Sequence, residues 1–167
     1  HYDPAVAAIE AGKMVYCEWP LGRTTAEAEK LLALAEQRGV RHIVGLQGQT
    51  SPINNYVRDL VADGYVGRPL SATVLVAAPN WGATLDGGYQ ADRANGANML
   101  TIQGGHALDS ISYCIGEFQD VAALVIRQRD QIALAGTREM IPLTSPDQLV
   151  VSAVTEQGAV TAFQIRG

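Results

Sequence analysis

The first part of the chain alternates helical and strand-like spacings of apolar residues. The patterns predict a short helix at 4–11, a buried strand at 13–18 and a second strand at 41–46. Between the strands, Thr24 begins a capping-box sequence, TTAE, and Gly39 ends a helix whose apolar residues recur at helical spacing. This order predicts a parallel, right-handed β–α–β unit.

The pattern changes around GYVGRP at 64–69, a stretch punctuated by glycine and proline. Before it, the sequence from Ser51 onward predicts a helix with an apolar face that contains Ile53, Tyr56 and Val57. Beyond it, β-rich segments and one major helix follow. The expected elements are a strand at 70–78, a long loop at 79–96, a helix at 98–115, a strand at 120–128, an irregular segment at 129–147 and a hairpin with Gly158 in its turn.

These patterns predict an α/β part followed by an α+β part, and composition limits what the parts can do. The 167 residues carry a net charge of −5 and no basic run, which argues against nucleic-acid binding. No apolar stretch approaches the ~20 residues that span a membrane. Cys17 and Cys114 lack metal-ligand spacing, so we expect free thiols in a reducing cytoplasm and no metal site.

One motif, AGKMVYCEWPLG, ends the first strand at Glu18, Trp19 and Pro20. Ligands of doubly wound sheets collect at the carboxyl ends of strands, so this corner is a candidate binding site. Gln47 follows the next strand and occupies the neighbouring position, with Gln49 close behind. Trp19 could stack on a ligand ring or fill the corner of the core, whereas Glu18 and Gln47 could equally be surface groups.

A second motif, QGGHALD, places His106 on the major helix. Imidazole titrates near neutral pH and suits the general base that oxidation of an alcohol requires. Asp109 and Tyr113 share its polar stripe, with Leu108 and Ile111 on the opposite face, and Asp109 could orient His106. The alternative is a polar helix face whose histidine is satisfied locally.

In this order, and with EAEKLLALAEQRGV, VGLQGQTSP and VADGYVGRP, the two motifs resemble the Gfo/Idh/MocA family of nicotinamide-dependent sugar oxidoreductases. The resemblance implies the C-terminal half of a Rossmann-like domain at 1–67. Residues 68–167 would form part of an open, mostly antiparallel sheet domain for substrate contact and dimerisation. The Glu-Trp-Pro corner and SPDQLVV resemble the branch that includes the fungal galactose-pathway repressor, a nucleotide-sensing regulator.

The chain departs from the family pattern in ways that bear on activity. Trp19 stands where the family has a catalytic lysine, and Ile102 where it has an aspartate. Indole has a single N–H donor and isoleucine has no polar group, so the usual acid–base chemistry is weakened. The glycine-rich phosphate turn of the family does not occur in the 167 residues. We therefore expect an internal fragment that does not turn over and binds neither NAD nor NADP tightly.

The sequence thus assigns His106 and Asp109 to catalysis and Glu18, Trp19, Pro20 and Gln47 to an NAD or NADP cofactor. The candidate substrate contacts are Trp81 and Tyr89 in the long loop and Gln103 and Tyr113 on the major helix. The function expected is NAD(P)-dependent oxidation of sugars or cyclitols. The alternatives are a non-catalytic sensor of nucleotides or sugars, or a truncated module that self-assembles through open sheet edges into a homo-oligomer.

Overall fold

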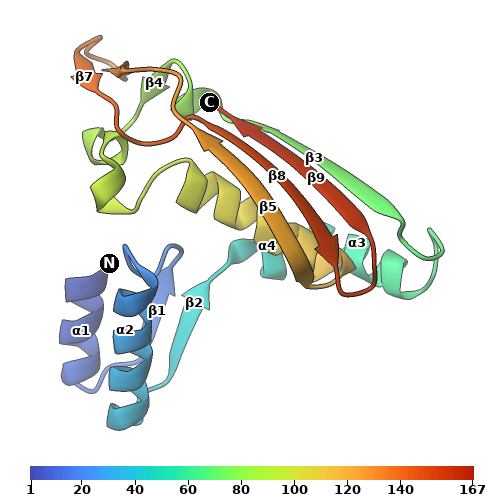
Figure 1. Ribbon diagram of the computed structural model, residues 1–167. Coiled ribbons are helices and arrows are strands. Elements are labelled where there is room, and N and C mark those ends of the chain that lie inside the picture. Colours follow the sequence, from blue (N-terminus) through green and yellow to red (C-terminus); the bar gives the residue numbers. More distant parts are fainter.

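The chain folds into two parts that meet at the carboxyl ends of two short parallel strands (Figure 1). The computed structural model describes residues 1–167, apart from the side chain of Pro79. The first part holds the N-terminal helices and the two-stranded sheet, and the second holds a long twisted sheet above helix α4. The α/β part is therefore followed by an α+β part, as the sequence predicts.

The first part is the predicted β–α–β unit preceded by one helix. Its elements are α1 (Tyr2–Glu10), β1 (Val15–Glu18), α2 (Thr25–Arg38) and β2 (His42–Gly45), and β1 pairs with β2 in parallel. Helices α1 and α2 pack together through a cluster of four buried residues, Ala5, Ile9, Leu31 and Ala35. Gly39 ends α2 with a left-handed φ of 62°, the backbone conformation that favours glycine there.

The capping box at the start of α2 forms only in part. Thr24 Oγ1 accepts from the Glu27 N–H at 3.2 Å, as predicted. The Glu27 carboxylate accepts from the backbone N–H of Arg23 at 2.7 Å, not from that of Thr24. The Arg23 side chain explains the difference, because its guanidinium draws the same carboxylate one residue outward.

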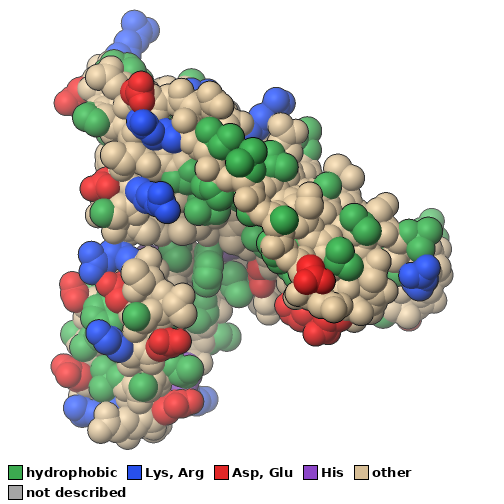
Figure 2. Space-filling model, viewed as in Figure 1, with side chains coloured by type: hydrophobic (Ala, Val, Ile, Leu, Met, Phe, Trp, Pro, Cys, Tyr) green, Lys and Arg blue, Asp and Glu red, His purple; other side chains and the backbone are tan. Residues whose placement is uncertain are grey.

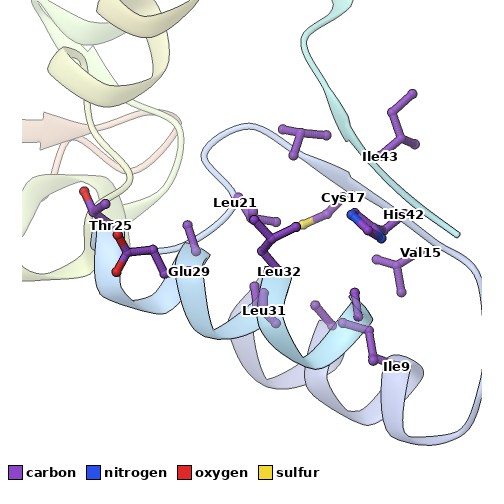
Figure 3. A pocket seen from close by; sticks show the side chains of 14 residues that line it. Ile9, Val15, Cys17, Leu21, Thr25, Glu29, Leu31, Leu32, His42 and Ile43 are labelled. Atoms are coloured by element: carbon purple, nitrogen blue, oxygen red, sulfur yellow. The ribbon is translucent and has the colours of Figure 1, made fainter. Parts of the chain in front are cut away.

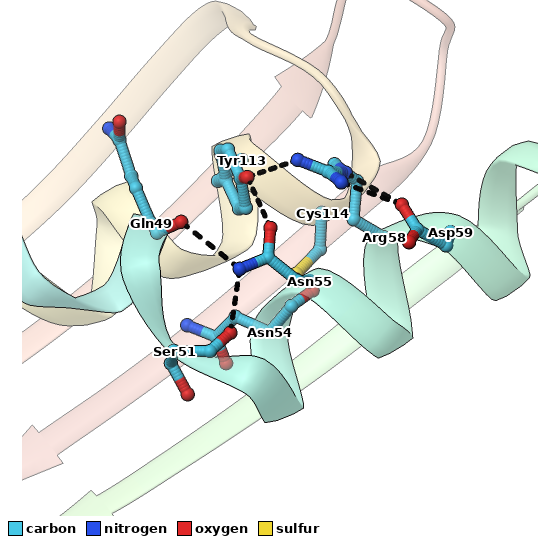
Figure 4. A network of polar contacts seen from close by, with 8 residues as sticks. All are labelled: Gln49, Ser51, Asn54, Asn55, Arg58, Asp59, Tyr113 and Cys114. Atoms are coloured by element: carbon cyan, nitrogen blue, oxygen red, sulfur yellow. Dashed lines mark hydrogen bonds and ion pairs between the residues drawn. The ribbon is translucent and has the colours of Figure 1, made fainter.

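Helix α3 (Pro52–Ala62) turns a different face inward from the one its pattern predicts. Ile53, Tyr56 and Val57 are exposed, whereas Asn55 and Arg58 meet α4 (Gly105–Ile115). Figure 4 shows the contacts: the hydroxyl of Tyr113 donates to Asn55 Oδ1 at 2.6 Å and accepts from Arg58, which also stacks on the Tyr113 ring. The helix itself forms as predicted, and Asn55 and Arg58 face α4 because Tyr113 offers them a polar partner.

The second part is built on a four-stranded open sheet in the order β3–β9–β8–β5. Its strands are β3 (Ser71–Ala77), β5 (Phe118–Ile126), β8 (Gln148–Thr155) and β9 (Val160–Arg166). The pair β3–β9 is parallel and the other two pairs are antiparallel, which confirms the mostly antiparallel sheet. Helix α4 follows the π-helical turn η5 (Leu100–Gly104) and packs on one face, over Leu149, Val151, Phe163 and Ile165.

Two segments expected to be irregular contain regular structure. Strands β4 (Thr84–Leu85), β6 (Gln131–Leu134) and β7 (Met140–Pro142) form a small sheet. The short turns η2 (Pro79–Trp81), η3 (Gly88–Ala91) and η4 (Arg93–Asn95) flank it, and η1 (Gln47–Thr50) follows β2. These strands are too short to show a period, and they form because Leu85, Ile132 and Leu143 bury one another across distant segments.

The face of the long sheet that points away from α4 is open. Leu75, Leu124, Val150 and Val160 are exposed on it, and Figure 2 shows hydrophobic side chains gathered over this region.

A buried carboxylate, that of Asp147, lies directly before β8. Asp147 accepts from the backbone N–H groups of Gln128 and Arg129, at 2.8 and 3.1 Å, and pairs with the Arg129 guanidinium.

Truncation of the main core should be costly. Phe163 is 1 % exposed and its ring meets Phe118 edge-on at 5.9 Å. We expect Phe163→Ala to lower the free energy of unfolding by about 3–5 kcal/mol in urea titrations. Leu124→Ala, at an exposed position, is the matched control and should change it by no more than about 0.5 kcal/mol. Equal effects of the two substitutions would contradict this assignment of the core.

The two free thiols should make stability depend on alkaline pH. Burial raises the pKa of both Cys17 and Cys114. The folded state therefore keeps its thiol protons to higher pH than the unfolded state, and the free energy of unfolding should fall as pH rises above about 8.5. Urea titrations at pH 7.5 and 9.5 test this, with the double variant Cys17→Ala, Cys114→Ala as control. An equal fall in that variant would assign the effect to other groups.

Candidate functional site

A cleft of about 830 Å³ lies where the carboxyl ends of β1 and β2 face the start of α4. Six of the site residues assigned from the sequence line it: Glu18, Trp19, Pro20, Gln47, Tyr89 and His106. They come from both parts of the chain, so the strand-end corner and the helix motif share one space. The volume lies within the ~300–1,000 Å³ that small-molecule sites occupy.

Trp19 is fixed on one wall of the cleft. Its indole Nε1 donates to the backbone carbonyl of Thr101 at 2.7 Å. The ring also lies against the backbone of Gly105, where an added Cβ would stand 2.9 Å from the indole Cε2. The one N–H of the indole is thus occupied by the protein, and Trp19 presents a ligand with an aromatic surface and no free donor.

His106 and Ile102 lie one helical turn apart and both line the cleft. Within the part of the chain that the structure describes, the imidazole of His106 makes no hydrogen bond to another side chain or to the backbone. Its imidazole is therefore available to a ligand. Ile102 contributes an apolar surface beside it, in place of the carboxylate that the family pattern implies.

Asp109 does not pair with His106 as proposed from the sequence. Its Oδ1 accepts from Gln49 Nε2 at 2.7 Å, and its Oδ2 is buried without a partner among the described residues. The physical reason is the turn η1, which brings Gln49 and Gly48 against this part of α4. Asp109 thus joins the loop after β2 to α4, outside the cleft lining.

Three further residues chosen from the sequence are not among those that line the cleft: Trp81, Gln103 and Tyr113. Trp81 packs between the main core and the small sheet. The Tyr113 hydroxyl is bonded to Asn55 and Arg58. The long loop does reach the cleft, but through Tyr89 and the segment around Gly96.

The sequence reasoning missed a charged pair on the rim of the cleft, Arg23 and Glu27. The Arg23 Nη2 and Glu27 Oε1 atoms are 2.6 Å apart, and hydrogen bonds from Arg23 hold the pKa of Glu27 below its usual value. The available signal was Arg23 directly before the helix cap, four residues from Glu27. His1 also lies here, with Nδ1 3.0 Å from the carbonyl oxygen of Pro20.

A second cavity lies between helix α2 and the strand pair, and Figure 3 shows its lining. It measures about 290 Å³ and is walled by apolar side chains such as Ile9, Val15 and Leu31, with Cys17 among them. Thr25, Glu29 and His42 also line it, but it is smaller than the cleft and contains neither the Glu18–Trp19–Pro20 corner nor His106. The cleft is therefore the candidate site.

Two classes of feature are not found among the described residues. No three His, Cys, Asp or Glu side chains come together as they would around a metal ion. No helix in the described chain has the length and apolar character needed to cross a bilayer.

Two protein-family models divide the chain between them. Residues 1–46 match the oxidoreductase family with an NAD-binding Rossmann fold, Gfo/Idh/MocA. Residues 52–167 match the C-terminal domain of Gal80p. The two matches meet in the loop that follows β2, and the expected boundary between residues 67 and 68 stays a prediction.

Individual relatives include enzymes and regulators. The chain is 39% identical to dehydrogenase aclE of Aspergillus oryzae, over 71% of this chain and 33% of that protein. It is 32% identical to levoglucosan dehydrogenase of Pseudarthrobacter phenanthrenivorans, over 75% and 33%. The galactose/lactose metabolism regulatory protein GAL80 of Saccharomyces cerevisiae is 26% identical, over 96% and 40%. The chain therefore spans between a third and two fifths of the length of these relatives.

Solved structures share the fold. A super-repressor mutant of Gal80p from Saccharomyces cerevisiae superposes with a TM-score of 0.91 at 24% identity, over 100% of this chain and 47% of that one. Levoglucosan dehydrogenase in complex with NADH and L-sorbose gives 0.82 at 24%, over 99% and 45%. The family models and the relatives above 30% identity establish that the chain belongs to the Gfo/Idh/MocA oxidoreductase family, with a second part of the Gal80p C-terminal type.

Proposed function

We propose that this chain supplies the substrate side of a cleft in which a sugar or cyclitol is oxidised with NAD or NADP. The observation that carries the proposal is the meeting of His106, from helix α4, with the Glu18–Trp19–Pro20 corner in one cleft. A titratable base then faces the strand end at which doubly wound folds bind ligands.

The lining of the cleft suits one end of the cofactor. Pro20 and Trp19 offer flat apolar surfaces for a nicotinamide ring, and Glu18 and Gln47 offer acceptors for ribose hydroxyls. A bound NAD or NADP would supply the hydride acceptor for the substrate carbon. The glycine-rich turn that holds the pyrophosphate does not occur in these 167 residues, so we expect the chain alone to bind NADH more weakly than micromolar.

In this proposal His106 is the catalytic base. It accepts the proton of the substrate hydroxyl while that carbon loses its hydride, and the products are a ketone or lactone and the reduced nicotinamide. Trp19 cannot share the task because its N–H is bonded to Thr101, and Ile102 has no proton to exchange. The proposal departs here from the expectation of no turnover: with one acid–base group where the family pattern has three, turnover should be slow and should need NAD or NADP at millimolar concentration.

The second candidate is a regulator that binds a nucleotide or sugar without oxidising it. The specific observation in its favour is the indole that replaces a titratable group on the wall of the cleft. The match of residues 52–167 to the C-terminal domain of Gal80p supports the same candidate. Self-assembly into a homo-oligomer through open sheet edges, the third alternative from the sequence, stays a separate proposal.

Ligand binding and oxidation can be tested on the same protein. Nicotinamide mononucleotide is the binding probe, and the imidazole signals of His106 and His42 are followed by NMR. Levoglucosan, galactose and myo-inositol are then offered with NAD or NADP while the absorbance of the reduced cofactor is recorded. We expect the probe to shift the His106 signals and leave those of His42, which is outside this cleft, unchanged.

His106→Gln is the test variant and His42→Gln its matched control. Oxidation that falls about 10²–10⁴-fold in His106→Gln and persists in His42→Gln supports the oxidoreductase. Saturable binding with no reduced cofactor from any substrate supports the regulator. Signals of His106 that no probe or sugar moves would overturn both functions.

A further inference from the structure

We propose that Trp19 is the positioning residue that sets the width of the cleft. Its indole ties the carboxyl end of β1 to the turn from which α4 begins, and so holds His106 opposite the Glu18–Trp19–Pro20 corner. The proposal rests on the proposed function in one respect, that this cleft is the site of ligand binding.

Apolar burial does not hold the two parts together. One hydrophobic cluster and the side chains packed on it come from residues 2–40, and the main cluster with its surroundings comes from residues 74–165. The small sheet has a third cluster within residues 81–143. Because no cluster spans the boundary among the described residues, the relative position of the two parts depends on a small number of specific contacts.

One of these specific contacts between the two parts is made by Trp19. Within the described chain, it is the one hydrogen bond that joins residues 1–45 to the second part. The Gln49–Asp109 bond starts from the loop after β2 and anchors that loop to α4. A close approach of Arg23 to the backbone of Gly96 adds contact on the other side of the cleft.

The indole contacts the Thr101 carbonyl and the Gly105 backbone, and hydrogen bonds hold the turn that carries both of them. Asn98 is 2 % exposed, and its Oδ1 accepts from the backbone N–H groups of Leu100 and Thr101, at 3.0 and 3.3 Å. In the π-helical turn, the Gly104 N–H bonds to the Met99 carbonyl at 3.0 Å. The extra residue of such a turn re-aims every side chain that follows it, here His106.

The second partner, Gly105, leaves room for the ring. Glycine weakens a helix relative to alanine, yet here the absent Cβ is what allows the indole to lie on the backbone. Any side chain at this position has to displace Trp19 or move the start of α4. The hydrogen bond to Thr101 and the absent Cβ of Gly105 therefore position the indole together, and each of these features can be tested separately.

Two variants remove these two features one at a time. Trp19→Phe keeps an aromatic ring and removes the N–H, whereas Gly105→Ala keeps the N–H and displaces the ring. Tyr65→Phe is the matched control, because Tyr65 is 77% exposed and does not line the cleft. Hydrogen exchange, measured by mass spectrometry on the full chain without ligand, reports on residues 99–106 and on strands β8 and β9.

We expect both test variants to exchange about fivefold or more faster in residues 99–106, the change that follows loss of one hydrogen bond. Strands β8 and β9 should keep the rate of the parent protein, and the NMR signals of His106, but not those of His42, should move. Tyr65→Phe should match the parent protein throughout.

Exchange in residues 99–106 that stays at the parental rate in both variants would overturn the proposal. So would an equal acceleration in β8 and β9, since Trp19 would then be an ordinary contributor to global stability. Because these measurements need no ligand, they stand even if nicotinamide mononucleotide fails to bind. A normal exchange pattern with good ligand binding would overturn the positioning role and leave the proposed function intact.

Discussion

The hydrogen bond from the Trp19 indole to the Thr101 carbonyl is the constraint on which the cleft depends. The folding of each part is secured by its own apolar cluster, but their mutual arrangement is not. A hydrogen bond in a partly exposed boundary contributes only about 0.5–1.5 kcal/mol, far less than a core. The fold of each part is therefore much more robust than the geometry of the site between them.

The elements that could be predicted from the sequence are those with local chemical signals. Thr24 and Gly39 mark the ends of α2, and Gly158, with a φ of 85°, marks the turn between β8 and β9. Strands β6 and β7 are only a few residues long. Gly136, with a φ of 80°, marks the turn between them, but β6 also depends on β4, a partner distant in the chain. The inward face of α3 was missed for the same reason: Tyr113, 55 residues beyond Arg58, selects it.

The site residues likewise divide into those that a local rule predicts and those that depend on tertiary contacts. The rule that ligands lie at carboxyl strand ends located Glu18, Pro20 and Gln47 in the cleft without any tertiary information. Helical periodicity placed His106 and Asp109 on one side of α4, but spacing cannot say which neighbour reaches each side chain. The loop after β2 brings Gln49 to Asp109, and that loop position is a property of the fold rather than of the helix.

The replacement of a titratable side chain by Trp19 changes what this corner of the family fold does. A lysine there would keep its ammonium group available for hydrogen bonds with a ligand, whereas the indole directs its one donor to the backbone and its ring to Gly105. With Trp19, the corner loses a side chain that can transfer protons and gains one that makes the mouth of the cleft rigid. An enzyme loses rate by that exchange, but a binding protein gains, because a preorganised cleft loses less entropy when it closes on its ligand. Trp19 is therefore compatible with a slow oxidoreductase and with a sensor. The two functions differ in whether His106 accepts a proton from the substrate hydroxyl.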